Sequence, residues 1–319
     1  MRKPRISTDR IEMRNRTTLQ SNLKIGFIQT IVDEEFAWIQ PIPTIHMKSI
    51  AQRKAWQEIR KGFYELKDYL DRPHVIILPE LTVPRGHIND LKALSKEIGS
   101  VVIAGLDFEK IGADRVQNRV IVTVPQNWPE EIKSRRVSTF YFGKNFFSEK
   151  ESQLFNRLGY KPFPDSTTYI LDAGIFGKIG VAICSDFYDI ERFVIYRGQI
   201  HHMIVVSHNR DTHSFYLLAE AISRLVYCNV VICNTGYYGD SLAFSPYRHH
   251  YKRIIYRHEG QKLFSTQVVT LPVLALDKAQ NRNDPDKEFK SPPPGYKKRT
   301  TLRSVKGVKY LSLSVPSDG

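Results

Sequence analysis

The chain has 319 residues, of which 41% are apolar, and a formal net charge of +14 at neutral pH. This length and apolar content predict one large α/β domain with a sizeable core. No apolar run approaches the ~20 residues that a bilayer-spanning helix needs, so we expect no membrane partner. The basic balance favours polyanions such as nucleic acid, although a solvated basic surface explains the same charge without any partner.

Cysteine usage points to a reducing compartment. The three cysteines, Cys184, Cys228 and Cys233, show no paired spacing, which argues against a disulfide framework and for a cytoplasmic location. There is no Cys-x-x-Cys, and the adjacent His201 and His202 point to opposite faces of a predicted strand, so we expect no metal site and no cofactor.

Strand and helix patterns alternate along the chain. Apolar residues every three or four positions predict a helix over 46–70 and a second through 88–98 that ends at Gly99. A third helix is predicted through 215–225. This alternation builds helices that cover a sheet. The predicted strands span 23–29, 74–78, 101–105, 119–124, 168–171, 178–184, 202–207 and 230–233.

Composition divides the chain into three parts. The polar, basic residues 1–22 lack the apolar core of a secretory signal and are expected to form a flexible arm. The domain is expected to span 23–276. After it, Asn, Asp, Lys and three prolines predict a basic tail over 277–319 that packs on the surface or on a partner.

Three residues with reactive side chains each follow a predicted strand. An apolar strand leads to Glu80, a second leads to Lys144, and the run 178–183 leads to Cys184. Chains of this class gather their chemistry at the carboxyl ends of strands. The three residues therefore form a candidate base, a candidate oxyanion donor and a candidate nucleophile.

These residue types suit attack on a poor electrophile. A free thiol has a pKa near ~8.5 and needs a base at neutral pH, a role that a buried Glu80 fits. Lys144 and the backbone N–H of Ser185 would face the developing oxyanion, where one donor is typically worth ~3 kcal/mol. Alternatively, Cys184 is a small core residue and Lys144 one of many surface lysines. The three together favour catalysis.

Other residues near strand ends complete the set of candidates. His208 and Asn209 follow the strand 202–207 and are candidates for the pocket wall. Cys228 and Cys233 fall inside helix and strand patterns, so we assign them to the core.

Several segments in sequence order resemble the carbon–nitrogen hydrolase (nitrilase) superfamily. The resemblance covers about residues 23–275. Each motif alone is a weak signal, and the order of the motifs along the chain makes the resemblance specific. The matching segments are Lys24–Gln29, Leu78-Pro79-Glu80-Leu81, Gln117-Asn118-Arg119, Tyr141-Phe142-Gly143-Lys144, Gly180–Asp186 and Val230–Asn234 with Gly236, Gly239 and Ser241.

The resemblance implies a four-layer αββα sandwich and a Glu80-Lys144-Cys184 triad that passes through a thioester acyl-enzyme. It further implies a second glutamate after the lysine, for which Glu151 is the first candidate and Glu149 its competitor. It implies a homodimer that pairs through the helix around 215–226. Its common activity favours a small amide over a nitrile as substrate.

Two alternatives remain open at this stage. The same acyl-enzyme would serve a transferase with an acceptor other than water. Shape and basicity are also similar, more loosely, to the nitrilase-like modules that accompany bacterial defence reverse transcriptases. In that case the chain is a binding or scaffold module that contacts nucleic acid or a protein through its basic surfaces.

Overall fold

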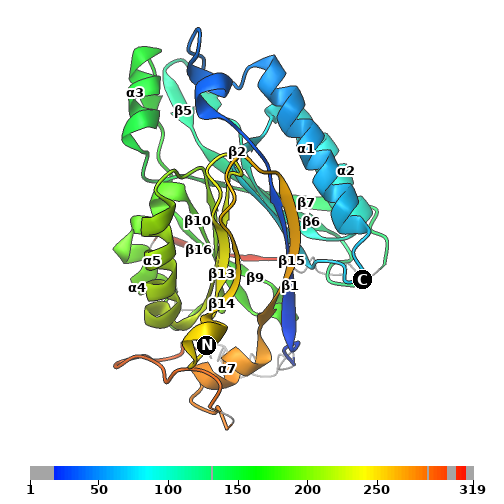
Figure 1. The fold of residues 1–319 in the computed structure, drawn as a ribbon, viewed down its shortest axis with the longest axis vertical. Coiled ribbons are helices and arrows are strands. Elements are labelled where there is room, and N and C mark those ends of the chain that lie inside the picture. The colour runs from blue at the N-terminus through cyan, green and yellow to red at the C-terminus, as the bar shows by residue number, and fades with distance from the viewer. Residues whose placement is uncertain (1–17, 131, 286, 300–306, 314–319) are drawn as a thin grey trace, which may run out of the picture.

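Two β-sheets pack face to face, and helices cover both outer faces (Figure 1). The computed structural model describes residues 18–130, 132–285, 287–299 and 307–313. The first sheet has the order β15-β1-β2-β3-β6-β7. Its strands are β1 (Asn22–Gln29), β2 (Val75–Val83), β3 (Val101–Leu106), β6 (Arg119–Pro125), β7 (Val137–Gly143) and β15 (Ser265–Pro272).

The second sheet has the order β14-β13-β12-β11-β10-β9-β16. Its strands are β9 (Thr168–Asp172), β10 (Lys178–Ile183), β11 (His202–Ser207), β12 (Asn229–Asn234), β13 (Ser241–Phe244), β14 (Ile254–His258) and β16 (Val308–Ser312). A small third sheet joins β4 (Glu109–Ile111), β5 (Arg115–Gln117) and β8 (Lys161–Pro162).

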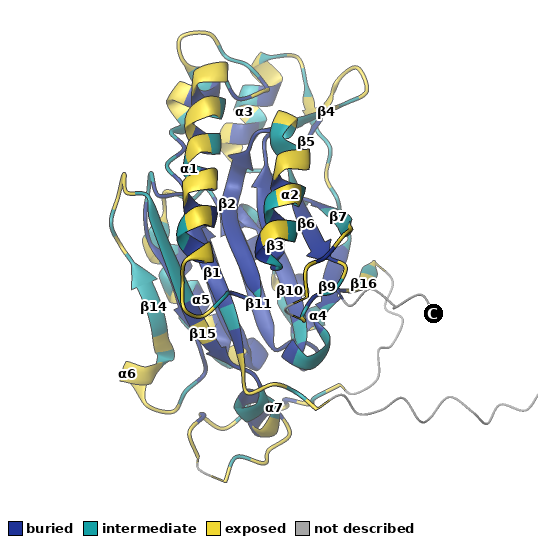
Figure 2. Ribbon diagram, turned by 90° about the vertical axis from the view of Figure 1, so that its right-hand side faces the viewer, coloured by how far each residue is buried: buried dark blue, intermediate teal, exposed yellow. Residues whose placement is uncertain are grey.

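Helices α1 (Ser49–Lys67) and α2 (Ile88–Ile98) lie on the outer face of the first sheet (Figure 2). Helices α4 (Ile190–Tyr196) and α5 (Thr212–Ile222) cover the second, and α3 (Glu149–Arg157) lies beside the small sheet. The shorter elements are α6 (His250–Arg253), α7 (Leu274–Gln280), η1 (Glu35–Ile39), η2 (Arg85–His87), η3 (Gly174–Phe176), η4 (Cys184–Tyr188) and η5 (Ser223–Tyr227).

Alternation along the strands produces the layers. On β2, Ile77 faces the core between the sheets, whereas its neighbours Ile76 and Leu78 face the cluster under α1 and α2. Side chains of a strand point alternately to its two faces, so a fully apolar strand fills two cores at once. The predicted αββα sandwich is therefore confirmed, and Figure 2 shows both sheets as its buried centre.

The two helices on the first sheet end where glycine or exposure stops them, one as predicted and one earlier than predicted. Gly99 ends α2 in the left-handed conformation with φ +72°, which only glycine adopts without strain. The predicted helix over 46–70 was too long: α1 ends at Lys67, and Leu70 is fully exposed instead of continuing the apolar face.

The described part of 277–319 packs against the domain. Phe289 and Tyr296 are buried beside α7, and β16 extends the second sheet in parallel next to β9. Residues 1–17 of the predicted arm lie outside the described residues, and the division into arm, domain and tail remains a proposal. None of the helices in the described ranges has the length and apolar content that a bilayer crossing requires.

Candidate active site

Four of the predicted site residues converge from four different elements. Glu80 comes from β2, Lys144 follows β7, Glu151 lies in α3, and Cys184 follows β10. The Lys144 amine donates hydrogen bonds to Oε1 of Glu80 and to Oε2 of Glu151, both at 2.7 Å. Lys144 is only 1% exposed, so these carboxylates replace water around its charge.

The Glu80 carboxylate is the centre of this network. Its Oε1 also accepts from the Asn118 side-chain amide at 2.8 Å, and its Oε2 accepts from the backbone N–H of His208 at 3.0 Å. The Cys184 thiol lines the same cavity as this carboxylate and interacts with it electrostatically. A carboxylate that is paired with the buried amine and interacts with the thiol is a suitable base for the proton on the sulfur.

A distortion of β2 brings Glu80 to this point. The pairing of β2 with β3 shifts register between Leu78 and Val83, and Leu81 has φ +57°. The backbone of β3 approaches closely at Gly105, where an added Cβ would lie 2.3 Å from Cα of Glu80. A glycine at this position lets the distorted segment pack against its neighbour strand.

Cys184 occupies a strained turn directly after β10. Its φ of +45° lies in the left-handed region, which is costly for a residue with a side chain and is often found at active sites. The side chain is 9% exposed and reaches the cavity described below. The predicted position at a strand tip is therefore the observed one.

Asp186 ties this turn to the segment that carries Lys144. Its carboxylate accepts from the backbone N–H groups of Asn145 and Phe146, at 3.1 and 2.8 Å, and lies 3.6 Å from the Arg192 guanidinium. In the sequence, Asp186 stands out only as part of the motif around the cysteine. Its spacing two positions after Cys184 was the available signal.

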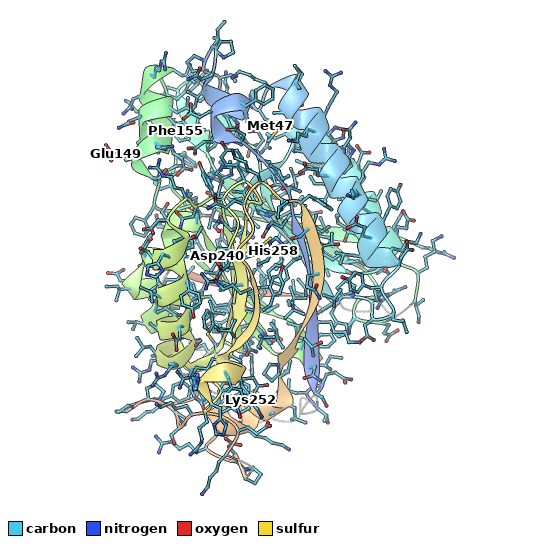
Figure 3. All side chains as sticks on the ribbon, in the orientation of Figure 1. Met47, Glu149, Phe155, Asp240, Lys252 and His258 are labelled. Atoms are coloured by element: carbon cyan, nitrogen blue, oxygen red, sulfur yellow. The ribbon has the colours of Figure 1, made fainter. Side chains whose placement is uncertain are left out.

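The structure separates the two candidates for the second glutamate. Glu151 is buried and belongs to a capping box, in which the backbone N–H and the hydroxyl of Ser148 donate to its Oε2 at 2.8 and 2.9 Å. Glu149 is exposed on the solvent side of α3, where Gln153 donates to it (Figure 3). Glu151 therefore adjoins Lys144, and Glu149 does not.

Burial and the paired charges set the ionisation of the site. Burial raises the pKa of Glu80, although Lys144 opposes the shift. Burial also acts to raise the pKa of Glu151, but Lys144 and Ser148 outweigh burial, and the pKa of Glu151 is lowered. Burial also acts to lower the pKa of Lys144, but its two carboxylates outweigh this and raise it well above the ordinary value.

The thiol is the resting form of the cysteine. Burial, followed by the charge of Glu80, raises the pKa of Cys184 well above the ordinary value, although Lys144 opposes this. Deprotonation therefore requires the proton to move to an adjacent group, and Glu80 is the carboxylate whose charge acts most strongly on the thiol.

A cavity of about 330 Å³ opens beside these groups. Its size is that of a small-ligand site, and its wall is largely aromatic and apolar. Asp107 holds two of the wall residues, because it accepts from the indole N–H of Trp38 and from the backbone N–H of Phe108, both at 2.9 Å. The apolar lining residues are Trp38, Ile39, Leu81, Phe108, Leu154, Tyr188, Phe215 and Tyr238.

The remaining predicted pocket residues also line this cavity. Ser185, His208 and Asn209 all contribute to its wall. Asn209 is held by its backbone N–H, which donates to the side chain of Asn234 at 2.8 Å. Glu34, on the segment before η1, was missed because only the fold brings this segment to the cavity.

The other two cysteines lie in the core, as predicted. Cys228 and Cys233 are fully buried, and burial raises the pKa of both thiols. Within the described ranges, no cluster of three or more His, Cys, Asp or Glu side chains has the arrangement of a metal site.

Comparison with solved structures identifies the architecture. A CN-hydrolase superfamily protein from Xanthomonas campestris, with an arsenic adduct in its active site, aligns with a TM-score of 0.58 at 13% identity, over 82% of this chain and 95% of that one. Nit3 of Saccharomyces cerevisiae, a nitrilase-superfamily member, aligns with a TM-score of 0.56 at 16% identity, over 83% of this chain and 95% of that one. The chain has the carbon–nitrogen hydrolase fold.

A third structure with the nitrilase fold is a mutant amidase from Nesterenkonia sp. AN1. It aligns with a TM-score of 0.56 at 11% identity, over 82% of this chain and 95% of its own. That structure carries the acetamide moiety of fluoroacetamide on its active-site cysteine. No protein-family profile and no curated protein matches this chain. The likeness therefore lies in the nitrilase fold, and the activity has to be argued from the site.

Proposed function

We propose that the protein is a thiol-dependent hydrolase of a non-peptide carbon–nitrogen bond, with an amide as substrate in preference to a nitrile. The observation that carries this proposal is the convergence of Glu80, Lys144 and Cys184 on one cavity, with the buried Glu80 carboxylate 2.7 Å from the Lys144 amine. The cavity beside Cys184 and the amidase among the structures of the same fold support it.

Acylation would proceed by transfer of the thiol proton to Glu80 as the sulfur attacks the amide carbon. The carbonyl oxygen would gain negative charge, which Lys144 and the backbone N–H of Ser185 would stabilise by about 3 kcal/mol per donor. Glu80 would then return the proton to the leaving nitrogen. The carbon–nitrogen bond breaks, ammonia or an amine leaves, and a thioester remains on Cys184.

Deacylation would use the same groups in reverse. Glu80 takes a proton from water, the resulting oxygen attacks the thioester carbon, and the thiol leaves with the proton that Glu80 gives back. Glu151 keeps Lys144 charged through both steps, because it holds a carboxylate 2.7 Å from the amine. The same thioester would pass to another nucleophile if the enzyme were a transferase.

Release of ammonia from a panel of simple amides tests the proposal. We expect Cys184→Ala and Glu80→Gln to lower the rate at least 10³-fold, because each removes a group that acts in bond breaking. Cys228→Ala, which removes a thiol outside the cavity, serves as the matched control and should stay near the wild-type rate. Equal rates for Cys184→Ala and Cys228→Ala would refute the proposal.

A homodimer through the outer face of the second sheet forms part of the proposal. Exposed apolar side chains gather on α4, α5 and η5: Ile190, Val194, Leu217 and Leu225 are between 52% and 74% exposed. Apolar surface of this kind is typical of a protein interface. Light scattering at micromolar concentration should give twice the mass of the chain, and Leu217→Glu should return the monomer mass.

The alternative function is a nitrilase-like binding or scaffold module in a bacterial defence or nucleic-acid-associated system. The observation in its favour is the net charge of +14. In that case Cys184→Ala would leave the biological activity intact, whereas loss of the basic residues would abolish it.

A further inference from the structure

The cavity wall next to the proposed triad carries an imidazole that lacks partners. Both ring nitrogens of His208 are shielded from solvent, and neither finds a hydrogen-bond partner in the described parts of the chain. A buried polar atom without a partner destabilises the fold, so a bound molecule that supplies partners recovers this free energy. The backbone N–H of His208 contacts Glu80, which places the side chain beside the reacting groups.

The imidazole is neutral and packs against two aromatic rings. Burial lowers the pKa of His208 to about 4, although Glu34 opposes the shift. The ring lies edge-on to the rings of Trp38 and Tyr238, with centroids 6.2 and 5.6 Å away. A neutral imidazole offers one donor and one acceptor nitrogen. It therefore suits a group that both donates and accepts, such as a hydroxyl or a carboxamide.

The charged residues around this imidazole are either paired with each other or exposed to water. Glu34 accepts from the hydroxyl of Tyr238 at 3.0 Å and forms an ion pair with Lys150. Burial acts to raise the pKa of Glu34, but Lys150 outweighs burial, and the pKa of Glu34 is lowered. The other charged lining residues outside the triad network, Glu149 and Arg210, are exposed to solvent, where water screens them.

A second unpartnered group lies next to the nucleophile. The hydroxyl oxygen of Ser185 is buried, and in the described chain it has no hydrogen-bond partner either. Ser185 and His208 thus line one cavity and together carry three polar atoms that have no partner in the described chain. A cavity of about 330 Å³ limits that molecule to a small one.

We propose that the substrate is a small amide whose acyl part carries an uncharged hydrogen-bonding group, a hydroxyl or a second carboxamide, and that His208 is the specificity-determining residue that binds this group. The inference rests on the hydrolase activity proposed above. A site built to hydrogen-bond a substrate group discriminates strongly against the analogue that lacks it, because its own polar atoms then stay unpaired.

Lactamide and propionamide test this inference, since they differ by one hydroxyl group. Ammonia release should give a kcat/KM ratio of lactamide to propionamide of about tenfold or more in the wild type. His208→Phe keeps an aromatic ring without nitrogens and should bring the ratio close to one. His208→Gln keeps a donor and an acceptor and should give an intermediate ratio. His213→Phe, on the exposed side of α5, is the matched control and should keep the wild-type ratio.

A ratio near one in the wild type, or an unchanged ratio in His208→Phe, would overturn the inference while leaving the hydrolase proposal in place. Protection of Cys184 from iodoacetamide by each amide separates the two proposals. Stronger protection by lactamide, lost in His208→Phe, supports the specificity role even if neither amide is cleaved. Equal protection without cleavage would overturn both. Should His208→Phe fail to fold by circular dichroism, the wild-type ratio and His208→Gln decide.

Discussion

The carboxylate of Asp186 accepts the backbone N–H of Phe146 at 2.8 Å and so joins the nucleophile turn to the segment that carries Lys144. These segments come from different sheets, because Lys144 follows β7 and Cys184 follows β10. Asp186 is 1% exposed, so water cannot replace it as the acceptor. It acts as a positioning residue between amine and thiol.

Removal of this link should lower the stability of the fold. Asp186→Ala leaves two backbone N–H groups and the nearby Arg192 without their carboxylate, which we expect to cost about 3 kcal/mol in the free energy of unfolding. Asp186→Asn keeps one acceptor oxygen and should cost less. Urea unfolding monitored by circular dichroism measures the difference. Equal, small losses in both variants would show that the link is dispensable.

The close approach of β3 to Glu80 should make Gly105 intolerant of a side chain. An added Cβ would lie 2.3 Å from Cα of Glu80 and 2.5 Å from the carbonyl oxygen of Pro79, so Gly105→Ala must shift the backbone that carries the proposed base. Overpacking of this kind costs about 1–3 kcal/mol. Amide turnover should fall more than tenfold.

Gly86→Ala provides the matched control for this substitution. An added Cβ at Gly86 meets no atom within 4 Å, so neither unfolding nor turnover should change by more than a small amount. If the two alanine variants behaved alike, the close contact at Gly105 would not matter for the site.

Stability should fall in acid because of a buried neutral histidine. Burial, then the neighbouring His201, lowers the pKa of His202 to about 3 from its usual 6.5. The unfolded state therefore binds a proton that the folded state rejects, and stability drops as the pH falls from about 6.5 towards 3. The expected slope is about 1.4 kcal/mol per pH unit from this group.

Urea midpoints between pH 7 and pH 4 measure this slope in the wild type and in His202→Gln. The variant should show a shallower dependence, since its amide does not titrate. The same slope in both proteins would contradict the assignment.

The basic charge should give weak, unspecific binding to polyanions that disappears with salt. Two arginines of the basic segment 248–257 are already paired: Arg253 donates to Glu220 at 3.0 Å and Arg257 to Asp240 at 2.7 Å. The exposed Lys252 lies at the opposite end of the molecule from α3 (Figure 3). Fluorescence anisotropy with a DNA duplex should show binding at low salt that falls steeply at physiological ionic strength.

Lys252→Glu should weaken this binding, whereas the exposed Lys54→Glu on α1 should weaken it less. If no binding occurs even at low salt, nucleic acid is removed from the proposed partners.

The residues of the proposed triad could be located from the sequence because each follows an apolar run. Lys144 and Cys184 follow strand ends as predicted, whereas Glu80 lies inside β2, which continues past its register shift to Val83. The contacts of Asp186 and the need for glycine at position 105 could not be derived, because both arise where distant segments meet. The part of the cavity wall formed by Trp38 and Glu34 was missed for the same reason.

Some short strands could not be predicted from the sequence for a different reason. The strands β4, β5 and β8 have two or three residues each, too few to show a periodic pattern. Likewise, β16 lies within the segment expected to be an extended tail, and it pairs with β9 from a distant part of the chain.

The most direct test of the account is to quench the reaction of the protein with an amide in acid after a few turnovers and to map the adduct by peptide mass spectrometry. We predict that the acyl group of the substrate is attached to Cys184, that Cys228 and Cys233 remain unmodified, and that the adduct is absent in Cys184→Ala. Steady release of ammonia with no acyl group on Cys184, or undiminished release by Cys184→Ala, would contradict the proposed thioester mechanism.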